Sequence, residues 1–170
     1  GAIADTLGED YAIRAMPELL TAAKGERHST EMAHLRGSRM VLVSETEDGR
    51  YLAVQRMKML TGETKVTARS MRQDPMTFKV QSTLWLQSNH RPNVIEQSRA
   101  VWRRIRVIPF SATVEEADAE LPEKLIEERA GILCWIVEGA TKWYRDGLKM
   151  PPEVAAAVED YRAASDTLGS

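Results

Sequence analysis

The chain has 170 residues, of which 43% are hydrophobic and 28% are charged, and its formal net charge is −2 at pH 7. This length fits one domain with a core of its own, and no apolar run approaches the roughly 18 residues of a membrane span. The first ten residues include Asp5, Glu9 and Asp10, whereas a signal peptide begins with basic residues. The single cysteine permits no intrachain disulfide. A cytoplasmic protein without a membrane partner is therefore expected.

Hydrophobic periodicity predicts strands that alternate with helices over the first 110 residues. Helices are expected at residues 1–7, 17–20, 31–36, 51–60 and 95–103. Strands are expected at residues 40–43, 83–87 and 104–110. The first of these strands, Met40–Val43, is a continuous apolar run, which is typical of a parallel strand that is buried on both faces.

A β-hairpin is expected at about residues 64–80. Lys65–Ser70 and Met76–Val80 have the composition of strands, and the segment Gln73-Asp74-Pro75 lies between them. An Asp-Pro pair favours a turn, so the two segments are expected to pair across it.

The pattern becomes helical after Ser111. One apolar stripe at helical spacing runs from Leu121 to Trp143, and an Ala-rich helix is expected at residues 153–165. The predicted fold class is α/β, with a parallel-sheet core at residues 1–110 and a C-terminal helical subdomain at residues 111–170. The side chains of the cysteine and the four tryptophans are expected in the core: Trp85, Trp102, Cys134, Trp135 and Trp143.

The charges are unevenly distributed along the chain. Residues 1–49 carry 5 basic and 9 acidic side chains, residues 50–110 carry 12 and 3, and residues 111–170 carry 6 and 13. Two interpretations are open. The basic middle forms a site for a polyanion, or acidic helices neutralise basic strands within one fold.

Polar residues follow both expected core strands. Glu45 and Glu47 come after Met40–Val43, and Asn89 comes after the strand at 83–87. Ligands of open α/β sheets bind beyond the carboxyl ends of the strands, where a carboxylate can hold Mg²⁺ and an amide can orient water or bind a phosphate. Each residue taken alone also fits an ordinary solvated turn.

Two groups of basic residues are candidates for phosphate contacts. Arg103 and Arg104 stand in an arginine cluster, from which a side chain can reach a neighbouring subunit's nucleotide. The hairpin carries a second group, which can contact a nucleic-acid backbone without reading its sequence: Lys65, Arg69, Arg72 and Lys79. The alternative is an ordinary charged surface for both groups.

Taken together, these stretches resemble the superfamily 3 helicase domain of phage and plasmid primase–helicases, the poxvirus-type group. The resemblance covers nearly the whole chain and rests on HLRGSRMVLVSETEDGR, VQRMKMLTGETKVTARSMRQDP, TFKVQSTLWLQSNHRP, AVWRRIRVIPF and GILCWIVEGATKWYRDGL. It implies a partial AAA+-like ATPase core from a hexameric, ATP-driven translocase of single-stranded DNA that acts in replication. It also implies ATP and Mg²⁺ as cofactors, and a gene carried by a phage, prophage or plasmid of a bacterial host.

The resemblance assigns roles to individual residues. Glu45 matches the Walker B acid, which would hold Mg²⁺ directly or through water, and Glu47 lies beside it at the nucleotide. Asn89 matches the sensor asparagine, and Arg104 matches the arginine finger best, with Arg103 second.

The family's middle motif leads into a DNA-contacting hairpin. Lys58 and Leu60-Thr61-Gly62 match this motif, and Arg69 and Arg72 fall on the hairpin itself.

One part of the family's site does not occur in these 170 residues. No Gly-rich loop ends in Gly-Lys-Ser/Thr, although such a loop holds the phosphates in this family. Residues 1–7 resemble the remainder of the helix that follows the loop, so a fragment of a longer ATPase is expected, with little or no ATP hydrolysis of its own. The alternative is a natural protein that lost the loop and serves as a non-catalytic DNA-binding or ring-assembly module.

Overall fold

The computed structural model describes residues 1–22, 28–44, 48–62, 65–69 and 74–166. The helices are α1 (Ala2–Leu7), the 3-10 helix η1 (Pro17–Leu19), α2 (His28–His34), α3 (Val54–Gly62), α4 (Arg99–Trp102), α5 (Leu121–Glu127), α6 (Arg129–Asp146) and α7 (Pro152–Asp166). The strands are β1 (Ala12–Ala15), β2 (Met40–Ser44), β3 (Val66–Ala68), β4 (Met76–Phe78) and β5 (Thr83–Gln87).

A parallel three-stranded sheet of order β1-β2-β5 lies at the centre of the fold. Met40 of β2 pairs with Ala12 of β1 and with Thr83 of β5, and Ser44 pairs with Gln87 at the carboxyl end. The four apolar residues of β2 are all buried. The predicted α/β class and the central buried strand are therefore confirmed.

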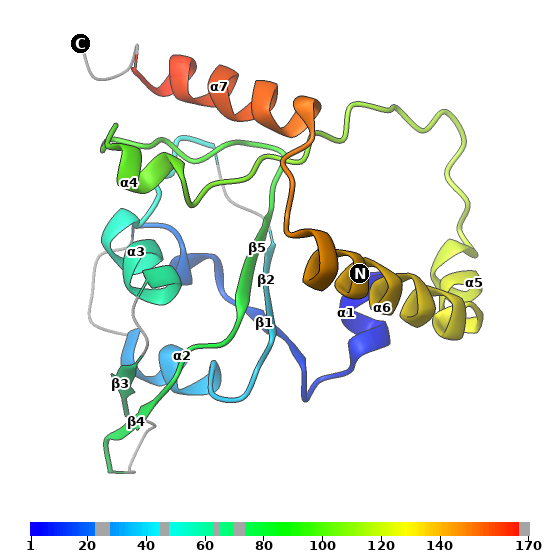
Figure 1. The fold of residues 1–170 in the computed structure, drawn as a ribbon, viewed down its shortest axis with the longest axis horizontal. Coiled ribbons are helices and arrows are strands. Elements are labelled where there is room, and N and C mark those ends of the chain that lie inside the picture. The colour runs from blue at the N-terminus through cyan, green and yellow to red at the C-terminus, as the bar shows by residue number, and fades with distance from the viewer. Residues whose placement is uncertain (23–27, 45–47, 63–64, 70–73, 167–170) are drawn as a thin grey trace.

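The apolar residues of β2 are buried because helices cover both faces of the sheet. Val41 and Val43 pack with Leu35 of the α2 region and Leu60 of α3. Met40 and Leu42 pack with Ala4 of α1. Figure 1 shows α1 and α6 on one side of the sheet, with α2 and α3 on the other.

β1 is a strand that sequence patterning did not predict. The segment Ala12–Ala15 includes two alanines and Arg14, and it has little of the β-branched character that marks strands. It is a strand because it pairs with β2 along its whole length. Tertiary pairing therefore overrides weak local propensity here.

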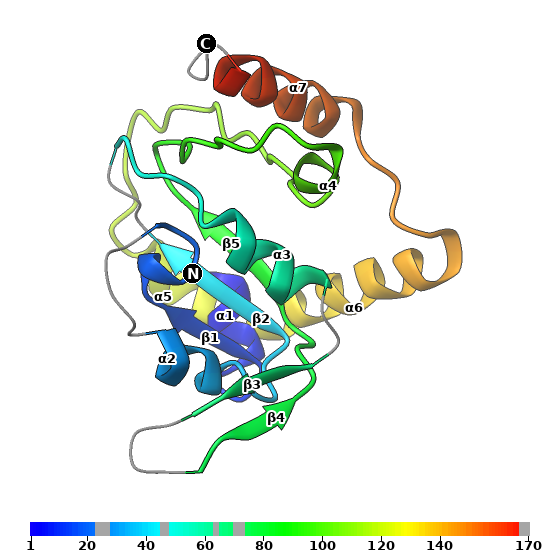
Figure 2. The same ribbon diagram turned by 90° about the vertical axis from the view of Figure 1, so that its left-hand side faces the viewer.

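The predicted hairpin strands are present. β3 and β4 pair antiparallel, with Val66 opposite Phe78, and the hydroxyls of Thr67 and Thr77 are 2.8 Å apart across the pair. Figure 2 shows the two strands projecting from the lower edge of the molecule, away from the three-stranded sheet.

The prediction of a strand at residues 104–110 is wrong. α4 ends at Trp102, and the chain from Ile105 to Phe110 belongs to no strand. A strand needs a partner for its backbone hydrogen bonds. Among the described residues β5 pairs with β2 alone, and a groove separates β5 from this segment.

The expected apolar stripe after residue 120 forms two helices, α5 and α6, which meet at Glu128. Gly147 ends α6 with a φ of 74°, a conformation that favours glycine. α7 follows and packs Val158 and Tyr161 against Trp102 of α4. None of the findings tests the predicted division into domains at residue 110, which stays a prediction.

The expectation that all four tryptophans lie in the core is wrong. Trp102 is 5% exposed, but Trp85, Trp135 and Trp143 are 40%, 66% and 59% exposed. Cys134 is exposed as well. The apolar stripe of α6 is therefore covered by the described residues in part only, since α1 and α5 are the elements beside it (Figure 1). No described helix is long and apolar enough to cross a membrane.

Candidate functional site

The carboxyl ends of β2 and β5 lie side by side at one edge of the sheet. Ser44 and Gln87 are the last residues of these strands and pair with each other. Asn89 follows two residues after β5, where it is exposed. Glu45 directly follows β2 in sequence, but Glu45 and Glu47 lie outside the described residues.

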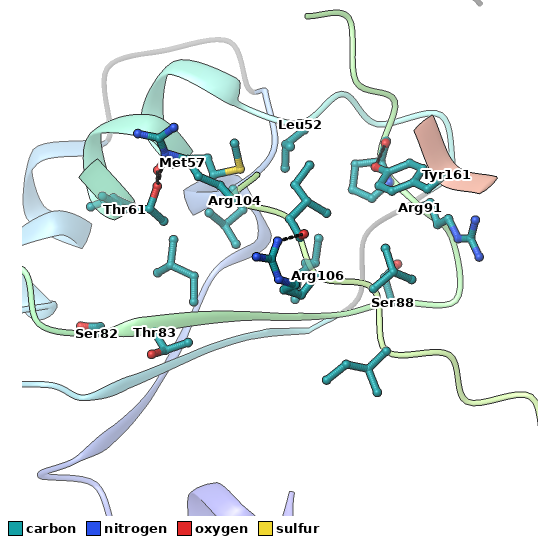
Figure 3. A pocket seen from close by; sticks show the side chains of 18 of the residues that line it. Leu52, Met57, Thr61, Ser82, Thr83, Ser88, Arg91, Arg104, Arg106 and Tyr161 are labelled. Carbon is teal, nitrogen blue, oxygen red and sulfur yellow. Dashed lines mark hydrogen bonds between the residues drawn. The ribbon is translucent and has the colours of Figure 1, made fainter. Parts of the chain in front are cut away.

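A groove of about 920 Å³ runs beside β5. β5 forms one wall, α3 lies above it, and the segment from residue 104 to residue 111 forms the opposite wall (Figure 3). Six of the residues singled out from sequence line this groove: Leu60, Thr61, Gly62, Lys79, Asn89 and Arg104. Arg103 is exposed at the end of α4 and is not among the described lining residues.

Arg104 is the predicted site residue with the most defined geometry. Its Nε donates a hydrogen bond to Oγ1 of Thr61 at 3.1 Å, and its Nη1 donates to the carbonyl of Ala100 at 2.5 Å. Thr61 is near the end of α3, and Figure 3 shows the guanidinium of Arg104 beside it. The arginine is half-buried and lines the groove from the segment that follows α4.

Arg106 reaches the same groove but is bound locally. Its Nη1 donates to the carbonyls of Arg103, at 3.0 Å, and Ile105, at 2.8 Å. Carbonyls satisfy the guanidinium's donors without cancelling its charge. The described lining of the groove thus includes Arg91, Arg104 and Arg106, and these positive charges suit an anionic ligand.

A charged pair that sequence reasoning missed ties α3 to the segment before α4. Nζ of Lys58 lies 2.5 Å and 2.7 Å from the two carboxylate oxygens of Glu96, and the Ser98 hydroxyl donates to the same carboxylate at 2.5 Å. The hydrogen bond from Lys58, followed by that from Ser98, lowers the pKa of Glu96. A signal was present, because Glu96 is one of three acids in the basic segment 50–110.

Tyr161 closes the far end of the groove, and sequence reasoning did not single it out. Its hydroxyl donates to the carbonyl of Pro92, its ring meets Trp102 edge-on at 5.3 Å, and the Arg91 guanidinium lies 5.6 Å from its ring centre. Burial raises the pKa of Tyr161 to about 12, against a smaller lowering by Arg91. These contacts attach α7 to the wall of the groove.

The basic residues of the hairpin lie on its surface. Lys65 and Arg69 flank β3, Lys79 follows β4, and all three side chains are exposed. Arg72 lies outside the described residues. Among the described residues, no group of three or more His, Cys, Asp or Glu side chains is arranged to hold a metal ion. The Mg²⁺ role of Glu45 therefore stays a prediction.

Comparison with solved structures supports the class of fold. The chain is similar to the C-terminal region of NrS-1 in its apo A form, with a TM-score of 0.53 over 94% of this chain and 38% of that one. The sequence identity is 14%, so this likeness concerns the fold alone.

Comparison with curated proteins gives viral relatives. The chain is 28% identical over 183 residues to a protein of Acanthamoeba polyphaga mimivirus named "Putative helicase". It is 24% identical over 187 residues to proteins of African swine fever virus named "Putative primase". These matches cover 95% and 98% of this chain, which spans about a fifth of each relative's length, 19% in both cases.

The fold defines the class of protein: a mixed α/β domain with a parallel three-stranded sheet. Its viral relatives are named helicase and primase. The family itself follows from a model that matches residues 5–104, more than half of the chain. The chain belongs to the DUF5906 family, which is described as a family of unknown function.

Proposed function

We propose that the chain is the C-terminal part of the ATPase core of a superfamily 3 primase–helicase that acts in DNA replication. The viral relatives named helicase and primase support a replication role of this kind. The ATPase, the hexameric ring and the translocation of single-stranded DNA extend the proposal beyond those names. A cytoplasmic location in a bacterial host, with a phage, prophage or plasmid as the source of the gene, belongs to the same proposal.

One observation carries the proposal. β2 and β5 end in register, with Ser44 opposite Gln87. Glu45 is the next residue in sequence after Ser44, and Asn89 follows two residues after Gln87. Arg104 faces the groove that Asn89 also lines. An amide and an arginine at one groove, together with an acid that follows the neighbouring strand in sequence, are the groups that phosphoryl transfer uses.

The residues present fit part of a nucleotide site. Asn89 would bind a terminal phosphate, and Glu45 would hold Mg²⁺, which neutralises charge on the phosphates when it is bound. Arg104 would contact the nucleotide of a neighbouring subunit. The loop that cradles the remaining phosphates does not occur in residues 1–170, so the chain by itself is expected to hydrolyse little or no ATP.

Complementation between subunits tests the proposal. The chain is mixed with an intact relative that has a phosphate loop but whose own finger arginine is replaced by alanine. The wild-type chain is expected to restore ATP hydrolysis, and Arg104→Ala is expected to reduce the restored rate by about 10³-fold or more. Arg145→Ala removes an exposed arginine of α6 and is the matched control.

Two results would overturn the ATPase proposal: DNA-stimulated turnover by the chain alone at the rate of an intact helicase, or restored activity that is indifferent to Arg104. The second candidate function, a non-catalytic nucleic-acid-binding module, is favoured by the excess of basic residues between 50 and 110. It predicts DNA binding without nucleotide and no restored ATP hydrolysis.

A further inference from the structure

The end of α3 holds the guanidinium of Arg104 in one orientation. Nε donates to the Thr61 hydroxyl at 3.1 Å, and Nη1 donates to the carbonyl of Ala100 at 2.5 Å. The Thr61 hydroxyl itself donates to the carbonyl of Met57 at 2.6 Å. Since its proton is used there, its oxygen lone pairs are available to the arginine.

Gly62 leaves the space that the third nitrogen of this guanidinium uses. A Cβ at Gly62 would lie 2.8 Å from Nη2 of Arg104, closer than real Cβ atoms approach such atoms. Gly131 and Gly139, the two glycines inside α6, have nothing within 4 Å of the same position. The absence of a side chain at Gly62 therefore matters for Arg104 specifically.

The contact orients a charge without cancelling it. Among the described residues, the partners of Arg104 are a hydroxyl and a carbonyl, and neither of these groups neutralises the positive charge of the guanidinium. An exposed arginine otherwise samples many rotamers, and ordering it on ligand binding has an entropic cost. An arginine that is already held avoids part of that cost.

We propose that Thr61 and Gly62 are positioning residues for Arg104. They hold its guanidinium at the groove, ready for the phosphates of a nucleotide bound by a neighbouring subunit. This inference rests on the proposed function, because that function supplies the nucleotide. Neither residue contacts the nucleotide itself in this proposal.

Three substitutions separate positioning from folding. Thr61→Val keeps the shape of the side chain and removes the acceptor, whereas Thr61→Ser keeps the acceptor. Gly62→Ala places a methyl group against Nη2, and the flexible end of an arginine can move away without unfolding the helix. Gly131→Ala adds the same methyl group in open space and is the matched control.

The first measurement follows the side-chain Nε–Hε signal of Arg104 by NMR in the isolated chain, assigned by its loss in Arg104→Lys. We expect a distinct signal with slowed hydrogen exchange in the wild type, in Thr61→Ser and in Gly131→Ala. In Thr61→Val and Gly62→Ala, we expect the signal to move toward that of solvated arginines, with faster exchange. An unchanged signal in both variants would overturn the positioning role.

The second measurement uses the mixture with the intact, arginine-deficient relative. Thr61→Val and Gly62→Ala are expected to lower the restored kcat about tenfold or more with little change in KM for ATP, since the partner subunit binds the nucleotide. Thr61→Ser is expected to retain most of the rate.

The outcomes distinguish the two proposals. A rate that depends on Arg104 but is the same in Thr61→Val and Gly62→Ala as in the wild type overturns the positioning inference and leaves the proposed function intact. A restored rate that is absent with the wild-type chain, or unaffected by Arg104→Ala, overturns the proposed function and the catalytic part of this inference. The NMR experiment then still decides whether Thr61 and Gly62 hold the arginine.

Discussion

At the scale of single residues, hydrogen bonds to oxygen atoms of the backbone and of hydroxyl groups organise the groove's arginines. Arg104 and Arg106 both donate to carbonyls, and Arg104 also donates to Thr61. A carboxylate at these contacts would have neutralised the guanidinium groups. The contacts that the described residues make therefore leave this positive charge available to a ligand, in agreement with the polyanion interpretation of the basic middle segment.

The tryptophans differ strongly in burial, although their side chains are identical. Trp102 is 5% exposed and meets Tyr161 edge-on, whereas Trp135 is 66% exposed. Trp102→Ala is expected to lower the free energy of unfolding by about 3–5 kcal/mol, because it removes a large packed side chain. Trp135→Ala is expected to change it by less than about 0.5 kcal/mol. Urea unfolding of the two variants checks this, and equal losses would contradict the difference in burial.

Tyr161 predicts a loss of stability at alkaline pH. Its pKa is raised from 10.0 to about 12 by burial, so its contribution to stability is complete below pH 10 and is lost as the pH rises from 10 through 12. Tyr161→Phe lacks the hydroxyl that donates to Pro92, and its stability is expected to be about 1 kcal/mol lower at neutral pH.

The measurement is the difference in unfolding free energy between the wild type and Tyr161→Phe at about pH 8 and about pH 11. The difference is expected to shrink or change sign at the higher pH. The wild type must keep the Tyr161 phenol neutral in the folded state at that pH, and Tyr161→Phe has no phenol at this position. A difference that is the same at both values would show that Tyr161 ionises as readily in the folded chain as in the unfolded one.

At the scale of elements, the local sequence pattern predicts a strand correctly where neighbouring elements cover the apolar faces of the segment. The predicted strand Met40–Val43 is present because helices cover both of its sides. The segment 104–110 has a similar apolar content, but it faces a groove where a neighbouring strand would have to lie. Its arginines bond to nearby carbonyls instead.

The pair Lys58–Glu96 joins α3 to the segment before α4. It predicts a loss of stability in acid. The hydrogen bond from Lys58 lowers the pKa of Glu96, so the pair stabilises the fold above the ordinary pKa of about 4.5 and loses that effect as the pH falls through the lowered value. Glu96→Gln is therefore expected to lower Tm at neutral pH, and its difference from the wild type is expected to shrink as the pH falls through the lowered pKa of Glu96.

Thermal unfolding at several pH values checks this effect, with Glu138→Gln as the control. Glu138 is an exposed residue of α6, and its substitution is expected to leave Tm nearly unchanged at every pH. A Tm decrease in Glu96→Gln that persists unchanged in acid would assign the effect to something other than the charge of Glu96.

At the scale of the whole molecule, the basic segment 50–110 includes α3, the hairpin, β5 and the wall of the groove. These elements meet in space, and Lys79 both follows the hairpin and lines the groove. The hairpin projects from the body of the molecule, as Figure 2 shows. A bound DNA strand is therefore expected to contact the hairpin, and its affinity is expected to fall as the salt concentration rises.

Fluorescence anisotropy with a labelled single-stranded oligonucleotide tests this expectation. The double variant Lys65→Ala, Lys79→Ala is expected to bind more weakly, and the slope of log K against log salt is expected to fall by about 1 for each lysine that contacts a phosphate. Arg72→Ala is expected from sequence to weaken binding in the same way.

The control removes the same net charge elsewhere. Lys142→Ala, Lys149→Ala alters exposed residues in and just after α6, and it is expected to change the affinity much less. Equal effects from both double variants would indicate a response to net charge and not to the hairpin.

The sequence by itself determined the strands β2 and β5, the hairpin and the order of the candidate site residues. The strands and the hairpin depend on local signals: the apolar runs at β2 and β5, and the Asp-Pro pair between β3 and β4. Resemblance then assigned roles to Glu45, Asn89 and Arg104, and these roles stay predictions.

Only the tertiary structure decided which residues meet and which faces are covered. The strand β1 exists because β2 pairs with it, and three tryptophans of similar local pattern to Trp102 are exposed because the described residues do not cover them. The contact of Arg104 with Thr61 joins residues 43 positions apart. Contacts of that kind depend on how helices and strands pack, which no periodicity along the chain records.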